Sequence, residues 1–269
     1  MSFSPMKVAA FDLLERVRQQ KPLVHHLTNW VTIGDCAQVV KTLGASPVMA
    51  HAPEEAAEMA QIASALVLNI GTLTVEFVEA MKVAARSANR KGIPVILDVC
   101  GAGATALRDR KCLELLNEVR IDVIKGNASE VARIGGESVK TRGVDATEVD
   151  ADLALLAEKL ADQRQATVVV TGKVDIATDG KKTYRIANGH PLMTHVVGTG
   201  CMAASVIGAF AAVERDLSLA AACALACFGI AAELAAEKAP GPAAFKARLF
   251  DCLYDLDRET VDRRQRIEQ

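Results

Sequence analysis

Short apolar runs alternate with longer segments of helical periodicity along much of the chain. Several runs, such as Ala-Leu-Val-Leu-Asn-Ile and Thr-Val-Val-Val-Thr, are almost continuously apolar, which is typical of strands buried on both faces of a parallel sheet. The helical pattern is illustrated by residues 72–89, where one face carries Val75, Val78, Met81 and Ala85. The predicted strands are residues 46–50, 65–70, 94–99, 123–125, 167–171, 175–178 and 183–187.

Turn sequences separate the last three predicted strands at hairpin distance. Gly172-Lys-Val-Asp175 lies between the first two of these strands, and Asp179-Gly180 lies between the second two. We therefore expect an α/β fold with a mostly parallel central sheet and an antiparallel edge. Two long alanine-rich helices follow, and no linker, repeat or low-complexity segment interrupts the pattern. Residues 1–269 are accordingly predicted to form a single domain.

Polar residues and glycines gather where four of the predicted strands end. In open α/β sheets, ligands bind at the carboxyl ends of the strands. We expect these four segments to form one crevice: Asn69-Ile-Gly71, Asp98-Val-Cys-Gly101, Lys125-Gly-Asn127 and Thr171-Gly172.

Composition narrows the range of partners and compartments. The 31 basic and 33 acidic residues give a net charge of −2 without long runs of either sign, so neither nucleic acid nor an acidic membrane surface is an expected partner. Seven cysteines without a C-x-x-C pair, and an N-terminus without a secretion signal, indicate the reducing cytoplasm. The uncharged stretches 196–213 and 217–232 are too rich in glycine and alanine to span a membrane, and we expect them to form buried helices.

The most informative motif is Gly198-Thr-Gly-Cys201, which precedes a helix-forming run. The glycines permit a tight turn with outward N–H groups, and the helix dipole adds positive potential at the same place. These features predict an anion hole with Cys201 on its rim, where a thiolate is favoured. A potential base beside a phosphate site indicates phosphoryl transfer, although the sequence has no Walker A loop.

Three further candidates have structural alternatives. Asp98 either bonds to the glycine turn that follows it or helps to hold Mg²⁺ and its waters. Glu130 is either the capping-box partner of Asn127 at a helix start or a residue that orients a Mg²⁺-bound water. Lys125, at a strand end, either reaches a nucleotide phosphate or is merely solvated, and its polar neighbours favour the phosphate.

The segment Gly101-Ala-Gly103-Ala-Thr-Ala106 formally matches a dinucleotide-binding fingerprint. It lies in the third strand–helix unit, however, and the next strand closes with Lys125 instead of an acidic residue. We therefore favour a close turn that approaches a phosphate or a metal-bound water over a nicotinamide-dinucleotide site.

Seven motifs occur in a characteristic order between residues 21 and 253: residues 22–31, 44–49, 68–73, Asp98 with 101–105, 124–130, 170–172 and 198–201. In this order they resemble the ribokinase-like superfamily and, within it, the hydroxyethylthiazole kinase family. The resemblance implies a three-layer α/β/α fold. It also implies ATP- and Mg²⁺-dependent phosphorylation of the primary alcohol of 4-methyl-5-(2-hydroxyethyl)thiazole in thiamine salvage, by a cytoplasmic homotrimer with substrate sites between subunits.

The resemblance also implies roles for individual residues. The thiazole pocket would include Asn29, Met49, Gly71 and Gly198. The nucleotide side would include Lys125, Asn127 and Thr171, with Asp98 and Glu130 holding the metal through water. The backbone of Gly198, Thr199, Gly200 and Cys201 would receive the transferring phosphoryl group, and Cys201 stands where sugar and pyridoxal kinases of the superfamily carry an aspartate base.

Two departures from the family pattern mark this chain. Lys125 stands where the family usually has arginine, and Asp98-Val-Cys-Gly101 stands where it usually reads Asp-Pro-Val-Gly. Three other functions remain as alternatives. The chain could be a pyridoxal or hydroxymethylpyrimidine kinase, a nucleotide-dependent dehydratase that repairs damaged nicotinamide cofactors, or a binding module without catalysis. The cysteine at position 201 argues against the related kinases, in which aspartate is expected.

Overall fold

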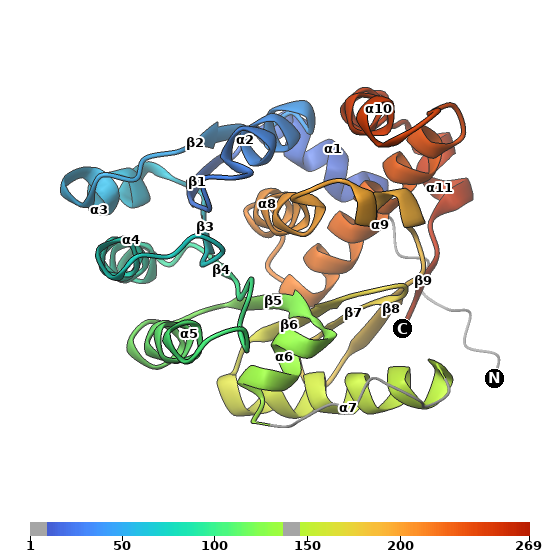
Figure 1. The fold of residues 1–269 in the computed structure, drawn as a ribbon. Helices are drawn as coiled ribbons and strands as arrows, with labels where there is room; N and C mark the ends of the chain where they lie inside the picture. Colours follow the sequence, from blue (N-terminus) through green and yellow to red (C-terminus); the bar gives the residue numbers. More distant parts are fainter. Residues whose placement is uncertain (1–9, 137–145) are drawn as a thin grey trace.

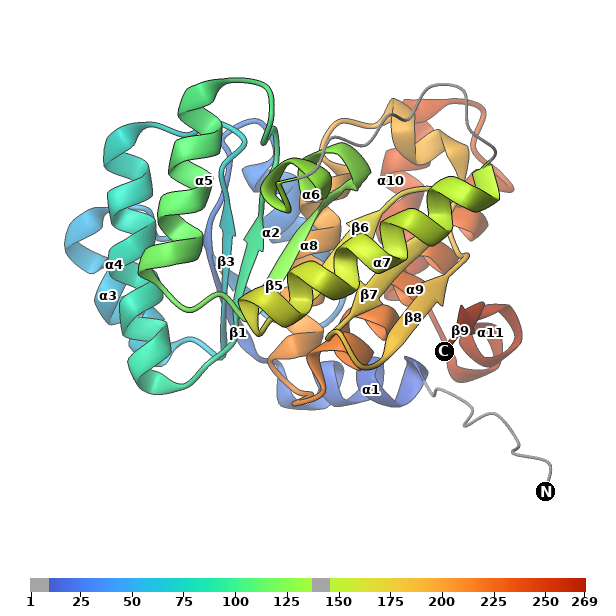
Figure 2. The same ribbon diagram turned by 90° about the horizontal axis from the view of Figure 1, so that it is seen from below.

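The computed structural model describes residues 10–136 and 146–269, which build three layers around one nine-stranded sheet (Figures 1 and 2). The strand order is β2-β1-β3-β4-β5-β6-β7-β8-β9. Neighbouring strands are parallel from β2 to β6 and antiparallel from β6 to β9. The predicted parallel sheet with an antiparallel edge is thereby confirmed. The strands are β1 Leu23–Leu27, β2 Ser46–Val48, β3 Ala65–Asn69, β4 Val95–Asp98, β5 Val123–Asn127, β6 Thr167–Thr171, β7 Asp175–Thr178, β8 Thr183–Ile186 and β9 Ile267–Glu268.

Helices cover both faces of the sheet (Figure 2). Alternate residues of one strand enter opposite cores: Leu66 and Leu68 of β3 pack in one apolar cluster, and Val67 packs in the other. This double burial explains why the strand sequences are almost continuously apolar. One face is covered by α1 Ala10–Gln20, α2 Ile33–Thr42, α8 Thr199–Ala211, α9 Leu217–Ala236 and α10 Pro242–Tyr254, with α11 Arg258–Arg264 beside α1. The other is covered by α3 Pro53–Ile62, α4 Val75–Lys91, α5 Ala106–Glu118, α6 Ala128–Ile134 and α7 Ala146–Arg164, and a 3₁₀ turn, η1 Pro191–His195, precedes α8.

All seven predicted strands form, with shifts of a few residues at their ends. Two further strands, β1 and β9, were not predicted. In β1 the sequence Leu-Val-His-His-Leu places two histidines inside a buried strand. The rings of His25 and His26 are fully buried, and each bonds one carbonyl oxygen, that of Ala50 (2.9 Å) and that of Val24 (3.0 Å). The β9 strand has two residues and is recognisable only through its pairing with β8.

The two alanine-rich helices α8 and α9 are buried, as predicted. Within the described ranges, α9 is the one helix long and apolar enough to cross a membrane, but 78% of the relevant window is buried inside the protein. Small residues allow close packing, since a Cβ atom on Gly208 of α8 would overlap the Val67 side chain of β3. Both helices therefore belong to the core. The assignment of residues 1–269 to one domain stays a prediction.

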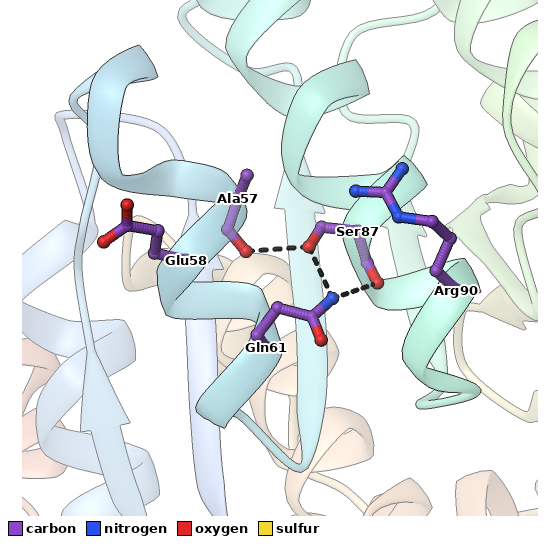
Figure 3. A pocket seen from close by; sticks show the side chains of 5 residues that line it. All are labelled: Ala57, Glu58, Gln61, Ser87 and Arg90. Carbon is purple, nitrogen blue, oxygen red and sulfur yellow. Dashed lines mark hydrogen bonds between the residues drawn. The ribbon is translucent and has the colours of Figure 1, made fainter.

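Helices α3 and α4 are joined by a polar seam beside a small surface hollow (Figure 3). Ser87 Oγ donates a hydrogen bond to the carbonyl oxygen of Ala57 (2.7 Å). Gln61 Nε2 donates both to Ser87 Oγ (2.7 Å) and to the Ser87 carbonyl oxygen (2.9 Å). Because these polar groups satisfy one another, the seam has a structural role in holding the two helices together.

Candidate active site

A cavity of about 840 Å³ opens at the carboxyl ends of β4, β5 and β6, between these strands and the start of α8. The crevice predicted from the sequence is therefore present at these three strands. Nine of the predicted site residues line it: Asp98, Lys125, Asn127, Glu130, Thr171, Gly198, Thr199, Gly200 and Cys201. Asn29 and Gly71 join the same site through hydrogen bonds. Met49 is not brought into this cavity; it follows β2, half-buried, and its carbonyl oxygen bonds His51 Nδ1 (2.8 Å).

The N-terminus of α8 faces this cavity without a capping side chain from any residue that the structure describes. Its N-cap, Gly198, has φ = +89°, and a Cβ atom there would overlap Thr32. Thr199 Oγ1 donates instead to the carbonyl oxygen of Met193 (3.0 Å). The first intrahelical hydrogen bond runs from Met202 N to Gly198 O (2.8 Å), so the N–H groups of residues 199–201 precede the helical ladder. Together with the helix dipole, they form a site suited to an anion.

Lys125 brings positive charge to the start of α8. Its side chain is almost fully buried, its Nζ lies 3.4 Å from both carboxylate oxygens of Asp98, and a Cβ atom on Gly200 would lie 3.1 Å from Nζ. Burial lowers the pKa of Lys125, but the carboxylates of Asp98 and Glu130 outweigh it and hold the pKa above its ordinary value. Burial has the opposite effect on the Asp98 carboxyl, whose pKa it raises, and the positive charge of Lys125 is the main influence that opposes this rise. The ammonium group is therefore a permanent cation beside the anion site.

Two asparagine amides hold the sulfur of Cys201. Asn29 Nδ2 lies 3.1 Å from Cys201 Sγ, and Asn69 Nδ2 lies 3.4 Å from it. The amides are themselves fixed, because Asn29 Nδ2 also donates to Asn69 Oδ1 (3.1 Å) and Asn69 Nδ2 to Asp98 Oδ2 (2.8 Å). Gly71 N completes the network by donating to Asn69 Oδ1 (2.8 Å). The sulfur thus sits among donors, which favours its deprotonated form.

The pKa of Cys201 is lowered to about 5. The largest cause is a hydrogen bond from Cys100, and smaller contributions come from Thr32, Lys125 and Asn29, while burial opposes the shift. The direction agrees with the thiolate expected from the helix N-terminus. The leading cause differs from the expected one, because Cys100 and Cys201 are far apart in sequence. The lowered pKa favours the thiolate form of Cys201, which is the form that accepts a proton.

Glu130 has the capping role that was one of its two readings. Its Oε2 accepts from Asn127 N (2.8 Å), and Asn127 Oδ1 accepts from Glu130 N (3.0 Å). Its Oε1 accepts from Gly101 N (2.7 Å), so Glu130, and not Asp98, holds the glycine turn. In the described parts of the chain, no group of three or more His, Cys, Asp or Glu side chains could enclose a metal. A metal here would be held by the phosphates and reached by these carboxylates through water.

The sequence did not predict the contacts of two residues near the site. Asn69 was expected at the crevice as a polar strand end, but its hydrogen bonds to Asp98 and Cys201 join it to a neighbouring strand and to α8, both far away in sequence. Arg108 was missed entirely; it donates to the carbonyl oxygens of Ile70 (2.9 Å), Gly71 (2.7 Å) and Cys100 (3.1 Å). It thereby ties the loop after β3 to the loop after β4. No sequence signal reveals a guanidinium that binds backbone carbonyls.

The loop after β6 closes the far side of the cavity. Thr171 Oγ1 donates to the carbonyl oxygen of Gly126 (3.3 Å), and Gly172 N donates to Asp175 Oδ1 (2.8 Å). Burial raises the pKa of Asp175 to about 7, although Gly172 and Lys125 oppose the shift. This side of the cavity therefore carries polar groups and a glycine.

Comparison with known proteins places these features in a family. The sequence matches the hydroxyethylthiazole kinase family over residues 14–259. It is 51% identical to the hydroxyethylthiazole kinase of Methanosarcina mazei over 256 residues, which cover 95% of this chain and 98% of the relative. It is 48% identical to that of Desulforudis audaxviator over 269 residues, which cover 100% of this chain and 98% of the relative.

Solved structures agree with the sequence relatives. The hydroxyethylthiazole kinase of Pyrococcus horikoshii OT3 superposes with a TM-score of 0.89 at 40% identity, covering 96% of this chain and 98% of that one. A ribokinase-like superfamily protein of Enterococcus faecalis V583 shares the fold with a TM-score of 0.62 at 13% identity, covering 94% of this chain and 91% of the other. The expected ribokinase-like architecture is thereby confirmed.

Proposed function

The chain belongs to the hydroxyethylthiazole kinase family and carries its activity in thiamine salvage, and from this premise we propose how its residues transfer the phosphoryl group. The γ-phosphoryl group of ATP lies on the N-terminus of α8, against the N–H groups of residues 199–201. The primary alcohol of 4-methyl-5-(2-hydroxyethyl)thiazole enters between Cys201 and this group. One observation carries the proposal: an uncapped helix N-terminus, a buried lysine and a low-pKa cysteine converge on one cavity.

The chemical step forms one bond and breaks one. The alcohol oxygen attacks the γ-phosphorus, the bond to the β–γ bridging oxygen breaks, and ADP leaves. The alcohol proton passes to Cys201 Sγ, whose amide donors Asn29 and Asn69 keep it aimed at the cavity. Such a transfer depends mainly on alignment and charge neutralisation. The α8 N–H groups and Lys125 supply both, since they approach the phosphoryl oxygens from one side.

We assign the nucleotide side to Lys125, Asn127 and Thr171, and the thiazole side to Asn29, Gly71 and Gly198. Met49 lies outside this cavity, so its place in the thiazole pocket stays a prediction. Asp98 and Glu130 line the same cavity, and their oxygens suit Mg²⁺, which keeps most of its water when it binds nucleotide phosphates. When bound, Mg²⁺ neutralises charge on the phosphate oxygens. The two carboxylates would hold it through water, because the neighbouring side chains and backbone N–H groups already occupy them.

We also propose that the protein is a cytoplasmic homotrimer with its substrate site between subunits. The rim beside Asn29 and Gly198 carries exposed apolar side chains: Trp30 is 53% exposed, Val31 68% and Val197 70%. A neighbouring subunit that covered these side chains would remove them from water and close the thiazole pocket. Light scattering of the purified protein tests the oligomeric state. The Val31→Asp substitution is expected to dissociate the trimer and to raise the KM for the thiazole.

The substrate is tested by mass spectrometry of hydroxyethylthiazole incubated with the protein, ATP and Mg²⁺. Pyridoxal and hydroxymethylpyrimidine run in parallel as competing alcohols. A phosphorylated thiazole as the dominant product is expected, and omission of Mg²⁺ should abolish it. Faster phosphorylation of another alcohol would overturn the substrate, whereas ligand binding without turnover would overturn the catalytic assignment of Cys201 and the α8 N-terminus.

A further inference from the structure

The cavity of the active site extends past the start of α8 to the segment that follows β8. It is lined there by residues 187–191 and, from α9, by Leu225, Phe228 and Gly229. We call residues 187–190 the β8 wall. With a volume of about 840 Å³, the cavity has room for much more than the transferring phosphoryl group at α8. The β8 wall therefore faces space that another part of the bound substrates can occupy.

The chemistry of this part of the cavity suits the nucleoside end of ATP. Leu225 and Phe228 offer apolar surface to a flat base, and Gly189 carries no side chain that would hold a ligand away. The triphosphate belongs at the start of α8, because the N–H groups of residues 199–201 and the ammonium group of Lys125 attract anions. An ATP molecule held there would extend its nucleoside into the remaining volume, beside the β8 wall.

The β8 wall packs on α9 at a glycine. A Cβ atom on Gly229 would lie 2.7 Å from Asn188, closer than real Cβ atoms approach another atom. Asn188 is buried, and both ends of its amide are bonded: Oδ1 accepts from Arg266 N (2.8 Å), and Nδ2 donates to the carbonyl oxygen of Arg264 (2.9 Å). The position of the wall is therefore set by α9 and by the segment that leads into β9.

Glu233 of α9 joins three donors on one carboxylate oxygen. Its Oε1 accepts from Asn188 Nδ2 (3.1 Å) and from Gly189 N (3.0 Å), and Arg266 Nη2 pairs with the same oxygen. Arg266 also donates through Nη2 (2.8 Å) and Nε (3.2 Å) to the carbonyl oxygen of Ala187. Glu233 and Arg266 thus bind three consecutive residues of the wall, although neither of the two lines the cavity.

Strand pairing brings Arg266 to this place. Strand β9 runs antiparallel to β8, with Ile267 opposite Ile186 (Figure 1). Ala187 N donates to the carbonyl oxygen of Arg266 (2.9 Å), which continues the pairing by one residue past β8. The side chain of Arg266 is half exposed, so a smaller side chain at this position leaves no cavity in the core.

We propose that Glu233 and Arg266 are positioning residues for ATP, which hold the β8 wall in the place where it receives the nucleoside. They act through residues 187–189 and do not touch the nucleotide. The inference rests on the proposed binding of the phosphates at the start of α8. It adds that the affinity for ATP depends on a carboxylate and a guanidinium group that lie outside the cavity.

The experiment compares Arg266→Ala with the unmodified full-length protein. The substitution removes the bonds from the guanidinium group to Ala187 and Glu233 but keeps the backbone pairing. We expect the KM for ATP, and the Kd for ADP in a calorimetric titration, to rise about tenfold, which is the order of effect of one hydrogen bond to a charged group. The kcat and the KM for the thiazole should stay within about twofold, because nucleotide binding is weakened while the phosphoryl site is intact.

Two further comparisons separate positioning from a general loss of structure. Arg264→Ala is the matched control: its guanidinium group pairs with Glu237 (2.7 Å), and its carbonyl bond to Asn188 is kept, so its KM for ATP should equal that of the unmodified protein. Glu233→Gln keeps an oxygen that can accept from Asn188 and Gly189, and it should bind ADP more tightly than Glu233→Ala.

The outcomes distinguish this inference from the kinase mechanism. An Arg266→Ala protein that melts at a lower temperature but keeps its KM for ATP and its Kd for ADP would show a structural role alone and overturn the inference. A fall in kcat with an unchanged KM for ATP would also overturn it, because the wall would then act on the transfer step. If the unmodified protein bound ADP but formed no phosphorylated thiazole, the proposed mechanism would fail, and the ADP titration would still decide the role of Arg266.

Discussion

Helices α8 and α9 are built from similar material but begin in opposite ways. Both are rich in alanine, both are almost wholly buried, and both pack on the same face of the sheet. At the start of α9, Asp216 caps the helix by accepting a hydrogen bond from Leu219 N (3.1 Å) and pairs with Lys182 (2.7 Å). At the start of α8, Gly198 provides no such acceptor, and the backbone N–H groups face a cavity that contains Lys125.

The difference shows that the free N–H groups at a helix N-terminus can be satisfied by a side chain of the protein or left for a ligand to satisfy. At α9 the Asp216 carboxylate accepts from one backbone N–H group of the first turn and interacts favourably with the helix dipole, so this end contributes to stability. At α8 these N–H groups have no such acceptor, and in the mechanism proposed above the transferring phosphoryl group binds there with more charge than a side chain carries. Substitutions at the two ends should therefore affect different properties, catalysis at α8 and stability at α9.

The largest effect is expected from Gly200→Val. A Cβ atom at this position would lie 3.1 Å from Lys125 Nζ, and the branched side chain would fill the place of the phosphoryl group. We expect kcat to fall by at least about 10³, the upper range for loss of an oxyanion donor, without a comparable loss of thermal stability. Gly241→Val is the matched control, because Gly241 begins α10 in extended backbone with open space around it. Near-normal turnover by folded Gly200→Val would remove the phosphoryl group from this helix end.

A smaller loss is expected from Lys125→Met. The substitution removes the cation beside α8 and leaves the carboxylate of Asp98 buried without its ion pair. We expect a fall of about 10² to 10³ in kcat/KM for ATP, together with a lower melting temperature caused by the unpaired charge. Steady-state kinetics at several ATP concentrations measure the first effect and calorimetry the second.

Lys125→Arg tests whether this loss is due to the charge. The charge is preserved, and most of the activity should return. If the Lys125→Arg variant is as inactive as the Lys125→Met variant, the role of Lys125 depends on the size and placement of its side chain and not on its charge alone.

Cys201→Ala is expected to slow the reaction without abolishing it. Loss of the proton acceptor should cost about 10² in kcat, because the anion site and Lys125 remain. In the unmodified enzyme kcat/KM should rise with pH as the sulfur loses its proton near its lowered pKa of about 5, and this acid limb should vanish in the variant. Rate profiles between pH 4 and 8, roughly the interval spanning that pKa, check both statements. An alanine variant that runs at full speed would show that Cys201 is not the base.

The smallest effect belongs to the capped helix. Asp216→Ala should lower the free energy of unfolding by about 1 kcal/mol and leave kcat unchanged. Although burial opposes it, hydrogen bonds from Lys182, Ser218 and Leu219 lower the pKa of Asp216 below its ordinary value of 3.8. The stabilisation is therefore present at neutral pH and is lost as pH falls below about 4, through the folded pKa, where the carboxylate is protonated. Urea unfolding at pH 7 and pH 3 (roughly neutral and acidic limits) measures the difference, with Asp216→Asn as a variant that keeps the cap.

Sequence patterns predicted the parallel strands and the anion site because both depend on local signals. Continuous apolar runs reflect burial on two faces, and the Gly198–Cys201 motif joins turn chemistry to a helix start. The buried strand β1 was missed because His25 and His26 carry polar rings, and their burial depends on carbonyl partners supplied by the tertiary fold. Hydrophobic periodicity carries no information about such partners.

The finer chemistry of the site could not be predicted for the same reason. The amides of Asn29 and Asn69 reach the sulfur of Cys201 from distant segments of the chain, and Arg108 donates to carbonyl oxygens of two separate loops. Glu130 had two readings, and only the structure shows that Asn127 and Gly101 donate to its two oxygens. Local sequence fixes neither the pairing of distant elements nor the direction of their side chains.

The late place of α8 and α9 in the sequence has a consequence for how the protein is made. The strands β1 to β5 leave the ribosome early, with α3, α4 and α5 ready to cover one face, but α8 and α9, which pack on the other face beside α1 and α2, come from residues 199–236. Until then, Val24, Val67 and Ile96, which are fully buried in the finished protein, lack the helix α8 that covers them. A growing chain with such an open face is prone to bind chaperones or to aggregate. Slow translation before residue 199 should therefore lower the yield of folded protein more than a pause after residue 236.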